Sequence, residues 1–240
     1  MHPAFQAWNG FYQRFRKWQE RTREPGLSAL LAIEATLLFI VTPFTGAGWL
    51  PDFAPPAVYV LFVLATLVVT SRSHLAASLV LFSVILSTVG TVIHADYPSV
   101  LTEWLSAGGR LLGISALSVV IAKAVFGPGQ VTLHRVQGAI VLYFNFGLFF
   151  FTLYQLVHIL VADSFAGLPA TGSEHGSGAA LLYFSFSTLT TAGFGDVKPL
   201  YPIARNLANL EAVIGQLFPA TLLARLVSLE IAHSRNPKHD

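Results

Sequence analysis

The sequence predicts an all-α membrane protein, and two observations support this prediction. Of the 240 residues, 54% are hydrophobic and 11% are charged, and the mean hydropathy of +0.62 exceeds what a soluble domain of this size needs. A bilayer core requires about 20 mostly apolar residues in a helix. Six stretches meet or nearly meet this length, namely residues 27–45, 56–71, 75–94, 100–126, 136–161 and 201–231. We therefore expect six transmembrane helices.

The distribution of charge predicts that both termini are cytoplasmic, because basic residues gather in cytoplasmic segments. With six spans, the basic residues expected inside are Arg14, Arg16, Lys17, Arg21, Arg23, Arg72, Lys123, Arg135, Arg225, Arg235 and Lys238. The acidic residues expected outside or at the outer rim are Asp52, Asp96, Glu103, Asp163, Glu174 and Asp196. The net charge is only +2, so this segregation reports topology and gives no sign of a nucleic-acid partner.

Residues 1–26 form a leader that is basic and aromatic, with a longer apolar run after it than a signal peptide has. Five aromatic residues recur there at roughly helical spacing: Trp8, Phe11, Tyr12, Phe15 and Trp18. This pattern is typical of an amphipathic helix lying on the lipids of an anionic inner leaflet. An ordinary basic flank that only fixes orientation would look similar, and the sequence leaves both interpretations open.

Between the fifth and sixth stretches, residues 176–190 are apolar over too short a length to span, and they run into TLTTAGFGDVKP at 188–199. Non-helical backbone at membrane depth must be buried in protein or face water. Gly193 and Gly195 permit unusual backbone angles. We therefore expect a re-entrant helix and a loop whose carbonyl oxygens replace the water around an ion. Thr191 adds a hydroxyl at the inner end, and Asp196 leaves a carboxylate at the outer mouth.

The motif TTAGFGD resembles the selectivity filter of tetrameric potassium channels, whose usual form is TVGYG followed by Asp. YFSFSTLT is similar to the pore helix of that family, with Tyr183 and Phe184 at the positions of its aromatic cuff. The residues expected to support the filter are Tyr183, Phe184, Ser187, Thr188 and Thr190. LEAVIGQLFPATLLARLV resembles the inner helix of bacterial ion channels with a two-span pore, with Gly215 at the gating hinge and Pro219 at a kink.

The resemblance implies a homotetramer in a bacterial plasma membrane, with passive K⁺ flow through a filter formed by four chains. The permeant K⁺ would lie at Thr191, Ala192, Gly193 and Phe194, with Gly195 completing the filter. The implied organisation is a cytoplasmic leader at 1–26, a voltage-sensor-like four-helix domain at 27–126, a linker at 127–135, a pore domain at 136–232 and a tail at 233–240. We expect no cofactor, and we expect the tail to be too short for a folded regulatory domain.

Two residues depart from the usual filter. Ala192 replaces Val, and Phe194 replaces Tyr, although GFG is a known variant among potassium-selective relatives. A weakly selective monovalent cation channel is therefore an alternative, and a non-conducting receptor or scaffold with a pore-like fold is another. An enzyme is not expected, because GxSxG, HExxH and phosphate-binding glycine motifs are absent from the sequence.

Charges within the predicted spans need partners or water, because lipid solvates them poorly. Arg110 is the expected partner of Glu34, and Ser187 or Thr188 is the expected partner of Glu211. The fourth span carries only Arg110 and Lys123, thirteen positions apart, which is too few for strong voltage gating. In the last span, four residues follow Gly215 at helical spacing and are expected to line the pore: Ala220, Leu223, Ala224 and Val227.

Overall fold

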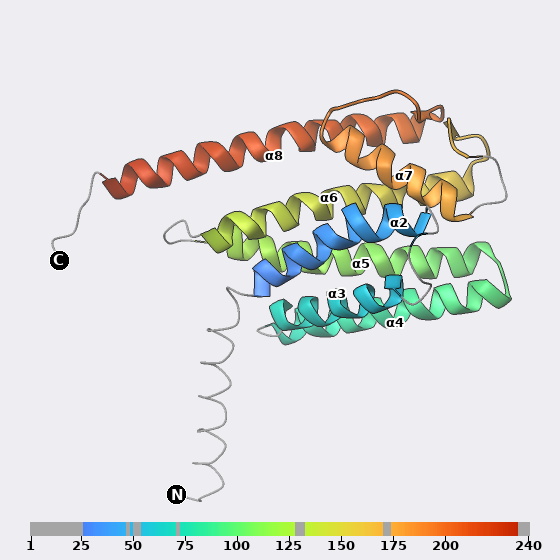
Figure 1. Cartoon of the computed structure of the whole chain (residues 1–240), viewed down its shortest axis with the longest axis horizontal. Helices are drawn as coiled ribbons and strands as arrows, with labels where there is room; N and C mark the ends of the chain where they lie inside the picture. The colour runs from blue at the N-terminus through green and yellow to red at the C-terminus, as the bar shows by residue number, and fades with distance from the viewer. Residues whose placement is uncertain are drawn as a thin grey trace, which may run out of the picture.

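The fold was obtained as a computed structural model, which describes residues 26–46, 49, 54–70, 73–127, 133–169 and 174–234. It is a set of long helices that run alternately in opposite directions (Figure 1). The predicted leader lies outside the described residues except for Gly26, as do residues 128–132 of the linker and 235–240 of the tail.

The first described helix begins at residue 26, passes through a π-helical turn, η1 (Leu37–Val41), and ends in α2 (Thr42–Gly46). The following helices are α3 (Ala54–Thr70), α4 (His74–Asp96), α5 (Val100–Val125) and α6 (Leu133–Leu160). After these come α7 (Glu174–Leu189) and α8 (Pro202–Ser234). The structure is therefore almost entirely helical in its described part, as the sequence predicts.

Five helices in the described residues are long and apolar enough to cross a membrane, at 26–44, 74–94, 100–125, 133–160 and 202–225. They coincide with five of the six predicted spans. The remaining one corresponds to α3, whose described apolar part covers only Tyr59–Thr70. This helix is shorter than the roughly 20 residues that a full crossing takes.

Hydroxyl side chains cap the N-terminal ends of two helices, α4 and α5. Ser73 accepts a hydrogen bond from the backbone N–H of Ala76 at 3.2 Å at the start of α4. Ser99 and Thr102 form a reciprocal capping box at the start of α5. Such caps satisfy backbone donors that the first turn of a helix leaves free. They set the short turns between antiparallel neighbours.

The leading helices pack against α6 of the same chain. Their common core consists of Leu27, Leu30, Leu117, Ile121, Val125, Ala139, Val141 and Leu142. These side chains come from the first helix, α5 and α6, so these two leading helices pack beside α6 of their own chain, while α4 contacts α5 and α3. The arrangement places α7 and α8 on the opposite side of α6 from α4 (Figure 1).

Two short strands close the end of the molecule where α6 and α7 are connected. β1 (Phe165–Ala166) pairs antiparallel with β2 (Lys198–Pro199), with Phe165 opposite Pro199. The backbone N–H of Leu200 also donates to the carbonyl of Ser164 at 2.8 Å. The ladder thus joins the segment after α6 to the segment that precedes α8. Two-residue strands leave no periodicity in a sequence, so this feature was not predicted.

Candidate functional site

The loop that follows α7 has an alternating backbone. Thr191, Gly193 and Gly195 have φ of +57°, +56° and +78°, whereas Ala192 and Phe194 between them do not have positive φ. Alternation of left-handed and right-handed residues turns successive N–H groups to one side of the chain, and their carbonyl groups to the other. Thr191 adopts this conformation without being glycine, at a cost of roughly 1–2 kcal/mol.

The N–H side of the loop is anchored to the last turn of α7. The amide of Thr191 donates to the carbonyl of Thr188 at 2.9 Å, and the amides of Ala192 and Gly193 donate to the carbonyl of Ser187 at 2.8 and 3.2 Å. Within the described residues, no hydrogen bond reaches a carbonyl oxygen of residues 191–195. Residues 190–196 are also exposed in the single chain. The loop therefore offers a row of free carbonyl oxygens along one edge.

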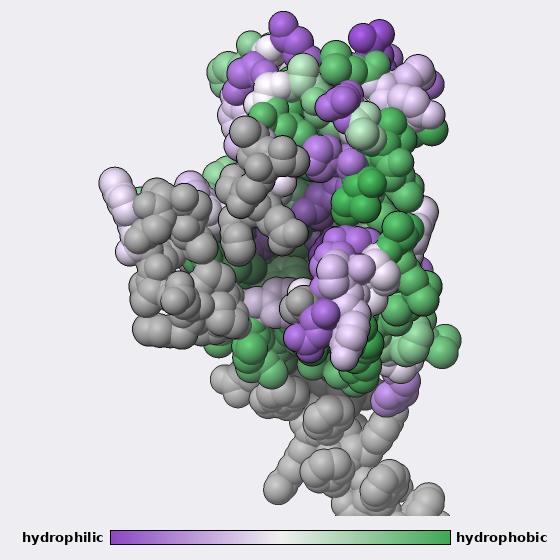
Figure 2. Space-filling view, turned by 90° about the vertical axis from the view of Figure 1, so that its right-hand side faces the viewer, coloured by the Kyte–Doolittle hydropathy of each residue, from purple (hydrophilic) through white to green (hydrophobic). Residues whose placement is uncertain are grey.

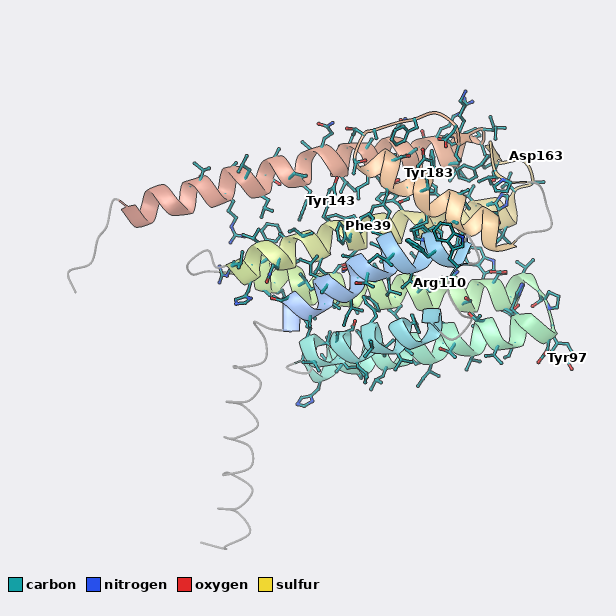
Figure 3. The ribbon with its side chains drawn as sticks, in the orientation of Figure 1. Phe39, Tyr97, Arg110, Tyr143, Asp163 and Tyr183 are labelled. Atoms are coloured by element: carbon teal, nitrogen blue, oxygen red, sulfur yellow. The ribbon has the colours of Figure 1, made fainter. Side chains whose placement is uncertain are left out.

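Of the two aromatic residues predicted to surround the loop, one contacts it and the other does not. Tyr183 stacks on Phe194 with ring centroids 5.8 Å apart and an interplanar angle of 16°. Phe184 is buried in the core, 5.0 Å from Tyr154 and 5.6 Å from Phe165 between ring centroids. Figure 3 shows Tyr183 on the α7 side that faces the loop.

The inner end of the loop rests on α8. The side-chain amide of Gln216 donates to the hydroxyl of Thr191 at 3.0 Å. At Gly215, an added Cβ atom would lie 1.8 Å from the carbonyl oxygen of Leu189, the last residue of α7. That same oxygen accepts a hydrogen bond from the hydroxyl of Tyr143 at 3.1 Å. The structure thus accounts for Gly215 by close helix packing, and its predicted role as a hinge stays a prediction.

Glu211 is fully buried behind the loop and joins three helices. One carboxyl oxygen accepts from the hydroxyl of Tyr154 on α6 at 2.6 Å, and the other contacts the hydroxyl of Ser185 on α7 at 2.5 Å. The predicted partners, Ser187 and Thr188, were therefore wrong, although the predicted helix was right. One face of α7 points to Glu211, and Ser187 lies too far around the helix, where its own hydroxyl donates to the carbonyl of Phe184.

The number of hydrogens that Ser185 can donate indicates whether the carboxyl group of Glu211 is protonated. The hydroxyl of Ser185 also bonds to the carbonyl of Gly147 at 2.7 Å, and a carbonyl can only accept. Because the hydroxyl of Ser185 has a single hydrogen, its bond to Glu211 needs the hydrogen of a protonated carboxyl group. With Glu211 neutral, every donor in the network has an acceptor, and no unpaired charge is buried.

The predicted pair of Glu34 and Arg110 is absent from the described residues. Both carboxyl oxygens of Glu34 are buried without a hydrogen-bond partner. Arg110 (Figure 3) instead donates to the hydroxyl of Ser106 at 2.9 Å and to the side-chain oxygen of Gln155 at 3.4 Å. The pairing was predicted from charge alone, and it failed because the two side chains line opposite ends of a cavity that is described below.

Arg110 is expected to have little influence on voltage dependence. Moving one charge through 100 mV supplies about 2.3 kcal/mol, and steep gating needs several such charges in each subunit. The hydrogen bonds to Ser106 and Gln155 also hold Arg110 in place. We expect Arg110→Gln to leave the slope of current against voltage unchanged in planar bilayers. A wild-type current that rises steeply with voltage and loses this slope in the variant would contradict the prediction.

The predicted pore-lining residues of α8 share an exposed side. Ala220, Leu223, Ala224 and Val227 are all exposed in the single chain, as is Pro219. Phe218 lies on another side, where its ring centroid is 5.3 Å from that of Phe146 and 6.0 Å from that of Tyr143. In Figure 1, the C-terminal end of α8 extends beyond the beginning of α6. The exposed apolar side is therefore free to meet lipid or further copies of the chain.

The sequence did not predict the contacts that Arg225, in the C-terminal half of α8, makes with the end of α5. Arg225 donates to the carbonyls of Phe126 and Gly127 at 2.7 and 3.1 Å, and its guanidinium lies 5.0 Å from the ring centroid of Phe126. It also reaches the carbonyl of Val125 at 3.3 Å. These are the free carbonyls at the end of α5, where a cation is favoured. In the sequence, Arg225 was recognisable only as a basic residue near the membrane edge, and it was used to predict the cytoplasmic side.

Residues 138–231 match the model of a protein family described as "Ion channel". No curated protein and no solved structure matches the chain. The matched range contains most of α6, the whole of α7 with its loop, and most of α8, whereas the leading helices lie outside it. Together with the long apolar helices, the match makes the chain an integral membrane protein. The match covers residues 138–231 alone, and it supports the resemblance of this part of the chain to the potassium channel superfamily.

Proposed function

We propose that the protein is a passive potassium channel whose filter is the loop at Thr191–Gly195. The observation that carries this proposal is the row of free carbonyl oxygens, with the amides of residues 191–193 bonded back to α7. Oxygens held in this way replace the hydration shell of K⁺. α7 is then the pore helix, Asp196 lies at the outer mouth, and the hydroxyl of Thr191 lies at the inner end.

The proposal requires four copies of the chain around the loop. A single loop presents its carbonyls from one side only, and coordination of an ion needs a ring of them. α8 supports this assembly, because Leu217, Leu223 and Val227 are 57%, 63% and 51% exposed in the single chain. Four α8 helices would place this side toward the axis and one another. The membrane would be a bacterial inner membrane with both termini in the cytoplasm, which takes α3 as a sixth span.

Flux across vesicles that contain the purified protein tests this function. We expect a K⁺ gradient to drive flux that barium blocks, and we expect Gly193→Ala to abolish it. A Cβ atom at Gly193 would meet nothing within 4 Å, so the damage would come from its φ of +56° and the altered carbonyl row. The protein should run as a tetramer in detergent.

Gly108→Ala is the matched control, because Gly108 lies in α5 and an added Cβ there also meets nothing within 4 Å. It should conduct like the unmodified protein. A monomeric protein, or vesicles without K⁺ flux, would contradict the proposal. Equal flux in Gly193→Ala and Gly108→Ala would show that ions do not pass along this loop.

A weakly selective cation channel is the second candidate. Phe194 stacks on Tyr183 but has no hydroxyl group with which to bond to the surrounding helices. Fewer bonds around the filter allow it to adapt to ions of other sizes. The reversal potential with K⁺ on one side and Na⁺ on the other separates the two candidates, because it lies close to zero for an unselective pore.

A further inference from the structure

The leading helices line a partly open cavity of about 340 Å³ that also reaches α6 and α7. Its walls are mostly apolar and include Leu37, Phe62, Val84, Ile114, Leu148 and Phe151. This volume falls in the range of small-molecule sites, which are typically apolar with a few polar groups. Figure 2 views the molecule from the end that carries the α4–α5 and α6–α7 connections, and the surface there is hollowed next to hydrophilic residues, with hydrophobic residues deeper in.

The cavity is elongated along the helices. The first helix lines it from Glu34 to Thr42, and α5, which runs the opposite way, lines it from Gly109 to Leu117. Eight helical steps of about 1.5 Å give a length of about 12 Å. Glu34 therefore lies toward one end of the cavity and Arg110 toward the other.

The two charged side chains at these ends are not fully bonded by the described residues. Glu34 is 1% exposed, and neither of its carboxyl oxygens has a hydrogen-bond partner. The Nε of Arg110 is likewise buried without a partner, although its other nitrogens bond to Ser106 and Gln155. Burial of a polar group without a partner costs several kcal/mol, and buried charges are normally paired. Glu34 thus has two buried atoms without a hydrogen-bond partner, whereas Arg110 has one.

We propose that this cavity binds an elongated, largely apolar amine whose protonated nitrogen donates to Glu34 and whose chain extends toward Arg110. An amine suits Glu34 because it can take the proton of the buried acid on binding, and the resulting carboxylate then accepts hydrogen bonds from the ammonium group. An apolar chain is required because the walls between the two ends offer mainly hydrocarbon. Arg110 disfavours a second cation at the far end and would favour an acceptor such as a hydroxyl or carboxylate there.

The site lies away from the ion path, so its test does not depend on conduction. Octylamine, octanol and octanoate share one chain and differ in the head group. Their binding to the purified full-length protein in detergent can be followed by calorimetric titration, with protein-free micelles as the blank. We expect octylamine to bind about tenfold more tightly than octanol. This factor corresponds to the free energy of one charge-assisted hydrogen bond. Octanoate should bind more weakly than octylamine.

Glu34→Gln should remove the preference of the protein for octylamine over octanol. Glu103→Gln is the matched control, because Glu103 is an intramolecular partner of His94 at 3.0 Å and does not line the cavity. It should keep the preference. The comparison of the three head groups on the unmodified chain needs no variant, so it holds even if Glu34→Gln fails to fold.

Three results would overturn the proposal. Tighter binding of octanoate than of octylamine would make Arg110 the anchor. Equal binding of octanol and octylamine would reduce the cavity to an apolar space that is indifferent to the head group. Octylamine binding that Glu34→Gln leaves unchanged would place the amine elsewhere on the protein.

Discussion

Replacement of Gly215 by alanine is expected to abolish ion flux and to destabilise the protein. The added Cβ would lie 1.8 Å from the carbonyl oxygen of Leu189, and this oxygen belongs to the backbone, so it cannot rotate away. α7 and α8 would have to separate at the point where α7 passes into the loop. Overpacking of this kind costs about 1–3 kcal/mol, and sometimes more. The free energy of unfolding and K⁺ flux from vesicles measure the two effects.

The same Gly108→Ala control keeps the chemical change and removes the clash. It should match the unmodified protein in stability and flux. A Gly215→Ala protein that conducts normally and unfolds at the same temperature would show that α7 and α8 do not meet here in the membrane. Loss of flux with unchanged stability would instead favour the predicted hinge role of Gly215.

Replacement of Glu211 by alanine is expected to have the second large effect. It would leave the hydroxyl of Tyr154 without its acceptor, take one partner from Ser185 and open a cavity where α6, α7 and α8 meet. Orphaned buried groups cost about 1–3 kcal/mol, and large-to-small changes add a cavity cost, so a loss of about 2–5 kcal/mol is expected. Denaturant unfolding in detergent would measure this loss.

Glu211→Gln distinguishes a neutral from an ionised Glu211. A glutamine amide can donate to Ser185 while its carbonyl accepts from Tyr154, which reproduces the protonated acid. We therefore expect Glu211→Gln to stay within about 1 kcal/mol of the unmodified protein and to conduct. A glutamine variant as unstable as the alanine variant would show that the carboxyl group is ionised, against the count of hydrogens.

The sequence predicted the helices well because apolar length is a property of each segment alone. Five predicted spans agree with the described helices to within a few residues at most ends, and the loop follows α7 as expected. α8 (Pro202–Ser234) also agrees with the predicted span at 201–231 to within a few residues at either end. α3 (Ala54–Thr70) likewise agrees with the predicted stretch at 56–71, and both are shorter than a full crossing.

Partners across helices could not be predicted in the same way. Glu211 and Ser185 meet because of the rotation of α7 against α8, and neither helix has a periodicity that fixes this rotation. The pairing of Glu34 with Arg110 failed for the same reason, since it assumed that opposite charges in neighbouring helices share a level. The β1–β2 ladder and the bonds of Arg225 depend on backbone carbonyls, which carry no signal in side-chain patterns.

The contacts of α8 suggest how it can deform. Two of its contacts lie on either side of Pro219, the contact of Gly215 with Leu189 and the bonds of Arg225 to the end of α5. Pro219 lies between them and lacks the N–H that would bond to the carbonyl of Gly215. The helix is therefore weakened at Pro219, next to Phe218, which packs on Phe146 and Tyr143. A displacement of the C-terminal part of α8 would therefore bend the helix at Pro219 or release Arg225 from α5.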